Sequence, residues 1–290
     1  MRAVVVGAGA WGSAFAHLLR SRGHEVTVAR RGAVADAPYE DAELVVLAVP
    51  SGAFREVLAQ VGGDAPILSL AKGLDPGTGA RLSTLVRDRP VAVLSGPNMA
   101  DEVLAGLPGA TVIASEDEEL ALRLQDAINS GVFRVYVNSD VVGVELCGAA
   151  KNVIALAAGA VDGLGLGDNA KAALMTRGLV EMARLGEAFG AAPETFSGLA
   201  GMGDLMVTCF HPSGRNRRAG ELIARGATVD DARAQIGQVV EGLTTAPVLR
   251  DVGRRIGVEL PITEGVCAVL EGMQIHELAN SLMGRRPTEE

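Results

Sequence analysis

Short apolar runs alternate with helical patterns along the first half of the chain. The apolar runs predict strands at Ala3–Val6, Glu25–Val28, Leu44–Ala48, Ile67–Leu70, Val91–Leu94, Ala110–Ala114 and Val132–Val137. Helical spacing predicts helices at Ala10–Arg20, Ala53–Val61, Gly79–Arg87 and Asp117–Ile128. Strands that are apolar throughout and alternate with helices are typical of a parallel sheet covered on both faces. We therefore expect an α/β domain of the Rossmann type.

The pattern becomes helical after Asn138. The predicted helices are Val141–Val161, Asn169–Phe189, Gly214–Ala224, Thr244–Ile256 and Ile262–Glu271. We place the boundary at 139/140, which gives a nucleotide-binding domain over 1–139 and an all-α substrate and catalytic domain over 140–290. A cleft between two such domains is the natural place for a ligand.

One predicted helix, Val141–Val161, is apolar on all sides, which is typical of a buried helix. Its only charged residues are Glu145 and Lys151. They stand six positions apart and therefore face different directions, so Glu145 is a poor partner for Lys151. The two charges and three glycines argue against a membrane span. Lys151 is expected to face a cavity, because a buried ammonium is costly without one.

Composition narrows the classes of function. The chain is 48% hydrophobic but only 3% aromatic, so Ala, Val and Leu must build its core. A net charge of −9 argues against a nucleic-acid binder. The three cysteines and four histidines are scattered, which predicts neither a disulfide framework nor a metal site. The first residues enter a strand without a signal peptide, so we expect a cytoplasmic protein.

Lysine is rare in this chain. Only Lys72, Lys151 and Lys171 are lysines among 26 basic residues. An ammonium can lose its proton when desolvated, whereas a guanidinium stays charged, so rare lysines are candidates for proton chemistry. Chance retention in an arginine-favouring sequence is the competing explanation.

A glycine motif follows the first predicted strand. Gly7, Gly9 and Gly12 form GxGxxG at the start of a helix, within the sequence GAGAWG that also contains Ala10 and Trp11. In this context the first glycine permits the turn, the second lets the backbone approach a pyrophosphate, and the third allows close helix packing. The motif predicts dinucleotide binding.

The end of the second predicted strand indicates which dinucleotide binds. Arg30 and Arg31 stand where an NAD-binding site usually has Asp or Glu for the ribose hydroxyls. Guanidinium groups suit a 2′-phosphate, so we predict NADP, with NAD as an alternative cofactor. An exposed pair of surface arginines is the competing interpretation.

Six further segments, together with GAGAWG, carry a resemblance that runs in order along nearly the whole chain. They are Leu68–Leu74, Leu94–Val103, Glu145–Gly159, Gly165–Met182, Gly198–Gly220 and Val239–Gly242. The set resembles the bacterial type of NAD(P)-dependent glycerol-3-phosphate dehydrogenase. The resemblance implies reversible hydride transfer between NAD(P)H and dihydroxyacetone phosphate. The product, sn-glycerol 3-phosphate, would serve phospholipid synthesis.

The resemblance also implies roles for individual residues. Lys151 matches the catalytic lysine, and Lys72 and Asp204 complete the catalytic group. Substrate contacts would come from Lys72, Gly96, Asn98, Lys151, Asp204, Thr208, Gly214, Arg215 and Asn216. Cofactor contacts would come from Gly7, Gly9, Ala10, Trp11, Gly12, Arg30, Arg31, Lys72, Ala100, Arg215, Val239 and Glu241. Lys171 receives no direct role.

Elementary chemistry agrees with these roles. Hydride addition to a ketone creates alkoxide character, which a lysine ammonium can stabilise and protonate. Partial desolvation would lower the pKa of that lysine toward working pH. The planar fork of Arg215 suits a phosphate, and Asp204 could orient an ammonium.

The chain departs from the family pattern at three places. Only Arg31–Glu43 connects the second and third strands, so a helix and a strand of typical members are missing. Gly214 replaces a serine before the Arg-Asn pair, which removes a hydroxyl but leaves a backbone N–H. Asn98 replaces a serine or threonine and can still form hydrogen bonds.

Two other functions compete with the leading hypothesis. A related reductase of the β-hydroxyacid type could also combine a Rossmann domain with a lysine on a long helix, and a panel of phosphorylated and unphosphorylated substrates separates it. A non-catalytic NADP-binding sensor would bind cofactor without turnover, and the short connection after Arg31 is in its favour. The alanine-rich helices could form either a homodimer interface or internal core.

Overall fold

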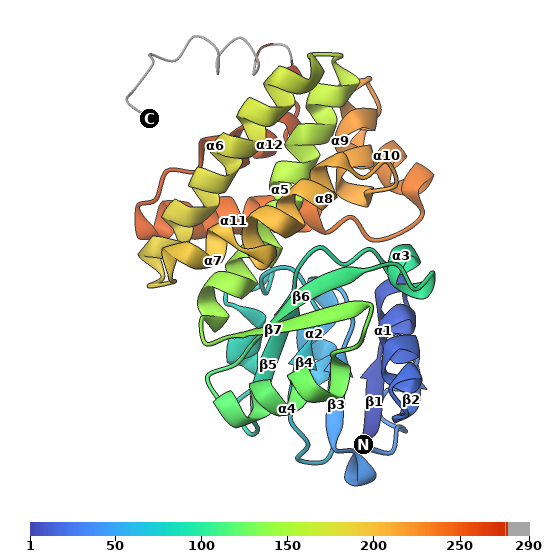
Figure 1. Ribbon diagram of the computed structural model, residues 1–290. Coiled ribbons are helices and arrows are strands. Elements are labelled where there is room, and N and C mark those ends of the chain that lie inside the picture. Colours follow the sequence, from blue (N-terminus) through green and yellow to red (C-terminus); the bar gives the residue numbers. More distant parts are fainter. Residues whose placement is uncertain (276, 278–290) are drawn as a thin grey trace.

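The computed structural model describes residues 1–275 and 277, and it divides into a sheet-containing half and a helical half (Figure 1). Seven strands form one sheet in the order β2-β1-β3-β4-β5-β6-β7. The strands are β1 Arg2–Val6, β2 Glu25–Ala29, β3 Leu44–Leu47, β4 Ile67–Ser69, β5 Val91–Ser95, β6 Gly109–Ala114 and β7 Phe133–Asn138. Every predicted strand is present, with bounds that differ by no more than a residue or two.

The sheet is covered on both faces. The first apolar core packs α1 (Ala10–Ser21) and α4 (Glu118–Ile128) against one face, through Phe15, Leu19 and Leu124. A second core lies on the other face beside α2 (Ser51–Leu58) and includes Phe54. The prediction of a sheet buried on both sides is therefore confirmed.

The prediction of a parallel sheet holds for β1 to β5 and is wrong at β6. β6 runs antiparallel to β5, and β7 is parallel to β6. The connection from β5 contains only the short helix α3 (Ala100–Leu104) and returns at the same end of the sheet. Without a crossover to the opposite end, the chain can only re-enter the sheet in the reverse direction.

The predicted helix at Gly79–Arg87 is also wrong, because this stretch holds only a single 3₁₀ turn, Leu82–Leu85. Leu74 pairs with Arg81 in an isolated bridge, and the Ser83 N–H donates to the Glu145 carboxylate. These contacts use backbone groups that a regular helix would need for itself.

The connection between β2 and β3 has no regular helix or strand, as the short sequence predicted. A 3₁₀ turn at Tyr39–Asp41 is its only element. Val34 and Tyr39 are buried in the core beside β1 and β3, where they cover part of this face of the sheet. The connection is short, but it is packed.

The helical half surrounds one long helix, α5 (Val141–Gly163), with its N-cap at Asp140. Its length and composition would suit a membrane span, yet 89% of its most apolar stretch is buried inside the protein. The helices packed around it are α6 Gly167–Ala188, α7 Pro193–Ser197, α8 Asp204–Phe210, α9 Arg215–Ala224, α11 Glu241–Ile256 and α12 Pro261–Leu270. α10 (Val229–Ile236) packs on α9. The all-round apolar pattern thus correctly predicted a core helix.

Glycines bring α5 and α9 into backbone contact. A Cβ at Gly220 would lie 1.9 Å from the Leu156 oxygen, and one at Gly159 would lie 1.8 Å from the Arg217 oxygen. No side chain fits at either position, because the facing atoms belong to a backbone that cannot rotate away. This close approach fixes the position of α9 relative to α5.

Gly220→Ala should destabilise the protein, although alanine normally stabilises a helix by about 1 kcal/mol relative to glycine. We expect the free energy of unfolding to fall by roughly 1–3 kcal/mol, the usual cost of overpacking. Gly52→Ala on α2 is the control, since its new Cβ would meet only the Pro76 ring at 3.9 Å. Denaturant unfolding measures both, and a gain in stability for Gly220→Ala would contradict the packing argument.

Candidate active site

The glycine motif forms an open turn between β1 and α1. Gly7 has φ 112° and lies so close to β3 that a Cβ would be 2.3 Å from the Ala48 oxygen. A Cβ at Gly12 would lie 2.0 Å from the Gly7 oxygen, whereas Gly9 faces open space. No side chain caps the N-terminus of α1. Ala10 and Trp11 begin α1 beside this turn, so exposed N–H groups remain for a pyrophosphate, and the site fits a dinucleotide.

Arg30 and Arg31 are both exposed at the end of β2. A backbone hydrogen bond from the Ala33 N–H to the Arg30 oxygen closes a turn there. Within the described residues, neither guanidinium has a hydrogen-bond or salt-bridge partner. Both side chains are therefore available to an anion next to the glycine turn.

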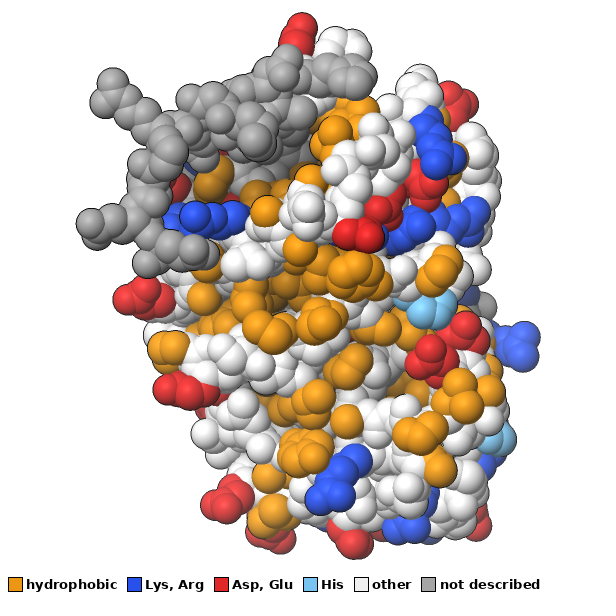
Figure 2. Space-filling view, turned by 45° about the horizontal axis from the view of Figure 1, so that its top comes forward, with side chains coloured by type: hydrophobic (Ala, Val, Ile, Leu, Met, Phe, Trp, Pro, Cys, Tyr) orange, Lys and Arg blue, Asp and Glu red, His pale blue; other side chains and the backbone are white. Residues whose placement is uncertain are grey.

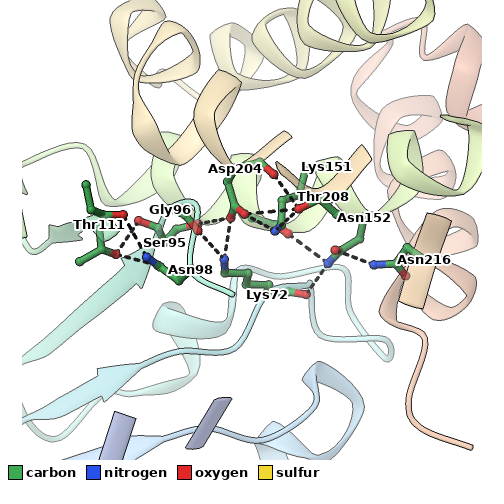
Figure 3. Close-up of polar contacts among 12 residues, drawn as sticks. Lys72, Ser95, Gly96, Asn98, Thr111, Lys151, Asn152, Asp204, Thr208 and Asn216 are labelled. Atoms are coloured by element: carbon green, nitrogen blue, oxygen red, sulfur yellow. Dashed lines mark hydrogen bonds and ion pairs between the residues drawn. The ribbon is translucent and has the colours of Figure 1, made fainter. Parts of the chain in front are cut away.

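The centre of the site is one buried carboxylate that binds two lysines (Figure 3). Lys151 on α5 donates to Oδ1 of Asp204 at 2.5 Å, and Lys72 from the segment after β4 donates to Oδ2 at 2.6 Å. Asp204 begins α8 and is 1% exposed, and Lys151 is 5% exposed. The structure thus brings together the three residues predicted to be catalytic.

Each lysine retains one unused donor. Lys151 also donates to the Thr208 hydroxyl at 2.8 Å, and Lys72 donates to the Gly96 oxygen at 3.2 Å. Thr208 in turn donates to the backbone oxygen of Asp204. Since an ammonium carries three N–H groups, one remains free on each lysine to meet a substrate oxygen.

Burial and charge act in opposite directions on this cluster. Burial lowers the pKa of Lys151 to about 7, with Asp204 opposing the shift and Lys72 adding to it. Burial acts to raise the pKa of Asp204, but the two ammonium groups outweigh it and hold that pKa below its ordinary value. Asp204 is therefore ionised, and Lys151 can change protonation state near neutral pH.

Local glycines shape the surroundings of Lys72 and Asp204. A Cβ at Gly148 would already contact Ser95 Oγ at 3.3 Å and Lys72 Cγ at 3.4 Å, so only a very small residue fits between α5 and the Lys72 side chain. A π-helical turn at Leu199–Gly203 directs Asp204 inward, and a Cβ at Gly201 would lie 2.1 Å from the Phe196 oxygen. Larger residues would displace the carboxylate or the Lys72 side chain.

The predicted phosphate-binding residues lie at the start of α9. Gly214 is the N-cap and has no side chain to cap the helix. Arg215 is exposed and donates to the Val239 oxygen at 2.9 Å. This contact brings together two residues predicted to meet the cofactor, while the N–H groups at the helix start stay open to an anion.

Two predicted substrate ligands have internal partners. The Asn98 amide donates to the Ala110 oxygen and accepts from the Thr111 hydroxyl. The Asn216 amide donates to Asn152 and accepts from the Gly242 N–H. The Asn98 amide therefore fixes the loop after β5, and the Asn216 amide connects α9 with α5 and α11. Each amide retains only part of its hydrogen-bonding capacity for a ligand.

Three other predicted cofactor ligands, Glu241, Ala100 and Val239, lie at or just before the start of a helix. Glu241, at the start of α11, accepts hydrogen bonds from the Ser51 hydroxyl and N–H at the start of α2. Burial raises the pKa of Glu241. Ala100 begins α3, and Val239 is exposed. The contact between Glu241 and Ser51 thus links the helical half of the molecule to the sheet-containing half.

Sequence reasoning missed Asn152 and Ser95. Asn152 donates to the backbone oxygen of Lys72 at 3.3 Å and accepts from Asn216 at 2.8 Å, so it connects the lysine segment with α9. The Ser95 hydroxyl donates to Asp204. The position of Asn152 directly after Lys151 was an available signal, since a buried amide needs partners.

A cavity of about 650 Å³ lies apart from these residues. It is lined by α4, β7 and neighbouring residues, among them Arg22, Gln125 and Arg134. None of the predicted site residues lines it. Geometry and chemistry therefore favour the lysine cluster as the functional centre.

Comparison with known proteins finds family profiles and relatives that are similar in sequence along most of the chain. Residues 33–121 and 140–280 match the profiles of the N-terminus and C-terminus of NAD-dependent glycerol-3-phosphate dehydrogenase. The chain is 43% identical to glycerol-3-phosphate dehydrogenase [NAD(P)+] of Nocardia farcinica over 330 aligned positions, covering 98% of both chains. It is also 43% identical to that of Anaeromyxobacter sp. over 332 positions, covering 100% of both. Both alignments are longer than this chain, so these relatives have residues that it lacks.

A solved structure agrees with these matches. The crystal structure of glycerol-3-phosphate dehydrogenase from Coxiella burnetii superimposes with a TM-score of 0.92 at 35% identity. The similarity covers 98% of this chain and 99% of the other. It therefore includes both the sheet and the helical half.

Asp204→Asn should strongly destabilise the protein at neutral pH. It would leave the buried ammonium of Lys151 and the partly buried ammonium of Lys72 without their counter-charge, a change that typically costs about 3–5 kcal/mol. Denaturant unfolding at pH 7 measures the loss. Asp230→Asn is the control, because the Asp230 side chain is 91% exposed and its ion pair contributes little. Equal stability of the two variants would show that the cluster does not depend on Asp204.

Proposed function

Because the chain belongs to the NAD-dependent glycerol-3-phosphate dehydrogenase family, we propose that it interconverts dihydroxyacetone phosphate and sn-glycerol 3-phosphate. It is an NAD(P)-dependent oxidoreductase that acts on a CH–OH group. The observation that carries the proposal is the buried Asp204 carboxylate bonded to Lys72 and Lys151. In the reductive direction the product supplies the glycerol backbone of phospholipids.

Lys151 is the general acid in reduction. When bound, the nicotinamide supplies the hydride that reduces the carbonyl carbon. The free N–H of Lys151 donates to the carbonyl oxygen, stabilises the developing alkoxide and transfers its proton, leaving a neutral amine and a secondary alcohol. In oxidation the neutral amine accepts that proton. A pKa near 7 suits both directions.

Lys72, Asp204 and Thr208 support this proton transfer. Asp204 and Thr208 each accept one Lys151 N–H and leave the third directed to the substrate. The free N–H of Lys72 binds a substrate oxygen beside Gly96 and adds positive charge where the alkoxide develops. All four groups are held by the fold before substrate arrives, which limits the reorganisation required during the reaction.

The start of α9 binds the substrate phosphate. Arg215 supplies a charge-assisted contact, and Arg215 and Asn216 supply backbone N–H groups at the helix N-terminus. Gly214 is the N-cap beside the phosphate, and its own N–H donates to the His211 oxygen at 3.0 Å. Asn98 holds the loop that carries Gly96. The phosphate serves as the remote group that positions the carbonyl.

The dinucleotide lies across the glycine turn. Gly7, Gly9, Ala10, Trp11 and Gly12 form the turn and helix start that receive the pyrophosphate, and the other cofactor contacts come from Arg30, Arg31, Lys72, Ala100, Arg215, Val239 and Glu241. Arg30 and Arg31 favour NADP over NAD. Since both are exposed and unpartnered in the described structure, a 2′-phosphate meets no competing carboxylate there.

The 139/140 division is part of the same proposal. The end of β7 at Asn138 and the N-cap at Asp140 support a nucleotide-binding domain over 1–139 and a substrate and catalytic domain over 140–290. We also infer a cytoplasmic homodimer. Figure 2 shows hydrophobic side chains gathered across the middle of one face of the molecule. Exposed apolar side chains on α6 and α8, including Val180 and Met206, support self-association.

Lys151→Ala should abolish reduction of dihydroxyacetone phosphate while NADPH still binds. Lys151→Arg should fail too, because a guanidinium does not release its proton. Wild-type kcat for reduction should decline as pH rises through the pKa of about 7, since the acid form disappears, and oxidation should show the opposite trend. NADPH absorbance measures turnover, and fluorescence titration measures binding.

Lys171→Met provides the control for this experiment. Lys171 is also buried, but it pairs with Asp162 rather than with the central cluster. This variant should lose stability and keep its kcat. Near-normal turnover in Lys151→Ala would disprove the assignment.

Arg215→Ala should raise the KM for dihydroxyacetone phosphate and lower kcat. A hydrogen bond to a charged group contributes about 1.5–3 kcal/mol, so most of the preference for dihydroxyacetone phosphate over dihydroxyacetone should disappear. NADPH affinity is measured separately, because Arg215 also contacts the segment at Val239. Arg225→Ala, at the other end of α9, is the control. An unchanged preference in Arg215→Ala would remove Arg215 from the phosphate site.

Replacing both Arg30 and Arg31 by serine should weaken NADPH binding far more than NADH binding. Loss of charge-assisted contacts to the 2′-phosphate should cost about 1.5–3 kcal/mol, or roughly 10- to 100-fold in Kd. Calorimetric titration with each cofactor checks this. Equal losses for both cofactors would mean that the pair does not recognise the 2′-phosphate.

A further inference from the structure

Glu145 is a buried carboxylate that the proposed chemistry does not use. It lies on α5, the helix that carries Lys151, and is 8% exposed. It makes no contact with Lys151, as its spacing predicted. Burial raises the pKa of Glu145, with hydrogen bonds from Ser83 and the charge of Arg81 opposing the shift. A group in this costly position requires a structural or functional reason.

All the hydrogen-bond partners of Glu145 lie in the sheet-containing half of the molecule. Its carboxylate accepts from the Ser83 N–H at 2.8 Å, the Ser83 hydroxyl at 2.5 Å and the Arg81 guanidinium at 2.9 Å. Glu145 therefore anchors one short stretch of chain, Arg81–Ser83, to α5.

That stretch is directly connected to Lys72. Arg81 pairs with Leu74 in a backbone bridge, and the Asp75 N–H donates to the Ala80 oxygen. The two pairings close residues 74–81 into a compact loop. Leu74 is two residues from Lys72, so a force that holds Arg81 also holds the backbone that carries this lysine.

Asp75 makes the loop rigid. Its carboxylate accepts from Arg55 on α2 at 2.8 Å and from the Thr78 hydroxyl at 2.5 Å. The loop can thus be expected to move as one unit rather than bend between Arg81 and Lys72. When Arg81 moves, we therefore expect the backbone at Leu74 and Lys72 to move with it.

α5 touches the Lys72 segment at three successive places. Glu145 binds Arg81 and Ser83, Gly148 lies under the Lys72 side chain, and Asn152 donates to the Lys72 oxygen. Lys151 projects from the same rigid helix toward Asp204. One helix therefore carries one lysine and fixes the segment that carries the other.

We propose that Glu145 is a positioning residue that sets the separation of Lys72 and Lys151, so that both ammonium groups share Asp204. The proposal rests on the proposed function of the lysine cluster. Glu145 acts through Arg81 and the loop and touches no reacting atom. When this anchor is lost, Lys72 withdraws from Asp204 and from the substrate oxygen.

Loss of the anchor has a specific electrostatic consequence. The charged groups that face Lys151 are Asp204 of α8 and Lys72, and the Cys209 thiol lies nearby on α8. Lys72 disfavours the protonated form of Lys151. Withdrawal of Lys72 should therefore raise the pKa of Lys151 and move the alkaline limb of the kcat profile to higher pH.

The test compares Glu145→Gln with Glu181→Gln. Glutamine can still accept the Ser83 N–H, but its NH₂ group cannot accept from Arg81. Glu181 is an equally buried carboxylate, 4% exposed, that accepts from the Ile262 N–H, the Thr263 N–H and the Thr263 hydroxyl. Burial raises the pKa of Glu181 as well. Glu181, however, binds the N-terminus of α12 and contacts neither Lys72 nor Lys151. Both carboxylates are thus buried, and each accepts three hydrogen bonds.

Glu145→Gln should lower kcat for dihydroxyacetone phosphate reduction by roughly tenfold, since displacement of a reacting group by 1 Å can cost about 100-fold. Its alkaline limb should move to higher pH, and its NADPH affinity should stay unchanged. Glu181→Gln should lose comparable thermal stability while its kcat and pH profile stay those of the wild type.

Arg81→Gln is the second variant and decides the question if Glu145→Gln does not fold. It removes the same ion pair from the loop side, where Arg81 is partly exposed, and should shift the pH profile in the same direction. Unchanged kcat and pH profile in the folded Glu145 or Arg81 variant would overturn the proposal. Equal shifts in Glu181→Gln would overturn it too, because they would reflect general destabilisation.

Lys151→Ala separates this proposal from the proposed function. If the wild-type enzyme turns over and Lys151→Ala does not, the lysine assignment stands and the Glu145 result is judged alone. If Lys151→Ala retains turnover, the lysine assignment fails, and the positioning proposal is overturned together with it. If the wild-type enzyme itself does not reduce dihydroxyacetone phosphate, the proposed function fails.

Discussion

Asp204 is a fully buried carboxylate with an ammonium group on each oxygen, and this arrangement dictates how the two halves of the chain meet. Lys72 reaches it from the segment after the central strand β4, and Lys151 reaches it from α5. With both lysines protonated, the three groups carry one net positive charge in a site that is largely buried. Such a cluster is tolerable only when every group is held closely by its partners. The contacts of Glu145, Asn152 and Glu241 between the halves all serve that requirement.

The low aromatic content explains how the backbones come so close together. A core of Ala, Val, Leu and Gly lets α5 and α9 touch through their backbones at Gly159 and Gly220. The same small residues let Lys72 pass over Gly148 and let the turn at Gly201 direct Asp204 inward. Large aromatic side chains would hold these segments apart. Composition, which alone predicted only the make-up of the core, thus also determines the geometry of the site.

Hydrophobic periodicity correctly predicted those strands and helices whose structure is determined by their own local sequence. The strands, α5 and the glycine turn carry their signals within a few positions, so the sequence identified each of them. It did not predict the reversal of β6, because the reversal depends on where the chain after β5 returns. The predicted helix at Gly79–Arg87 failed because Glu145, more than 60 positions away, binds Ser83. α10 was missed although Thr228 and Asp231 form a capping box. The family resemblance identified the site residues from the sequence. Only the structure shows that Asn98 and Asn216 already form hydrogen bonds within the protein.

The overall charge of −9 gives the positive cluster a further role. A negatively charged protein repels a phosphorylated substrate at long range, so attraction must come from groups near the site. In the proposed function, Arg215 and the N-terminus of α9 supply that attraction at the phosphate, and Asn152 connects α9 with the lysine segment through Asn216. The arriving phosphate adds negative charge near a centre that carries excess positive charge. Negative charge nearby favours the ammonium form of Lys151, which burial alone disfavours. Binding of the phosphorylated ketone therefore favours the protonation state that its reduction requires, and an unphosphorylated ketone of the same shape does not.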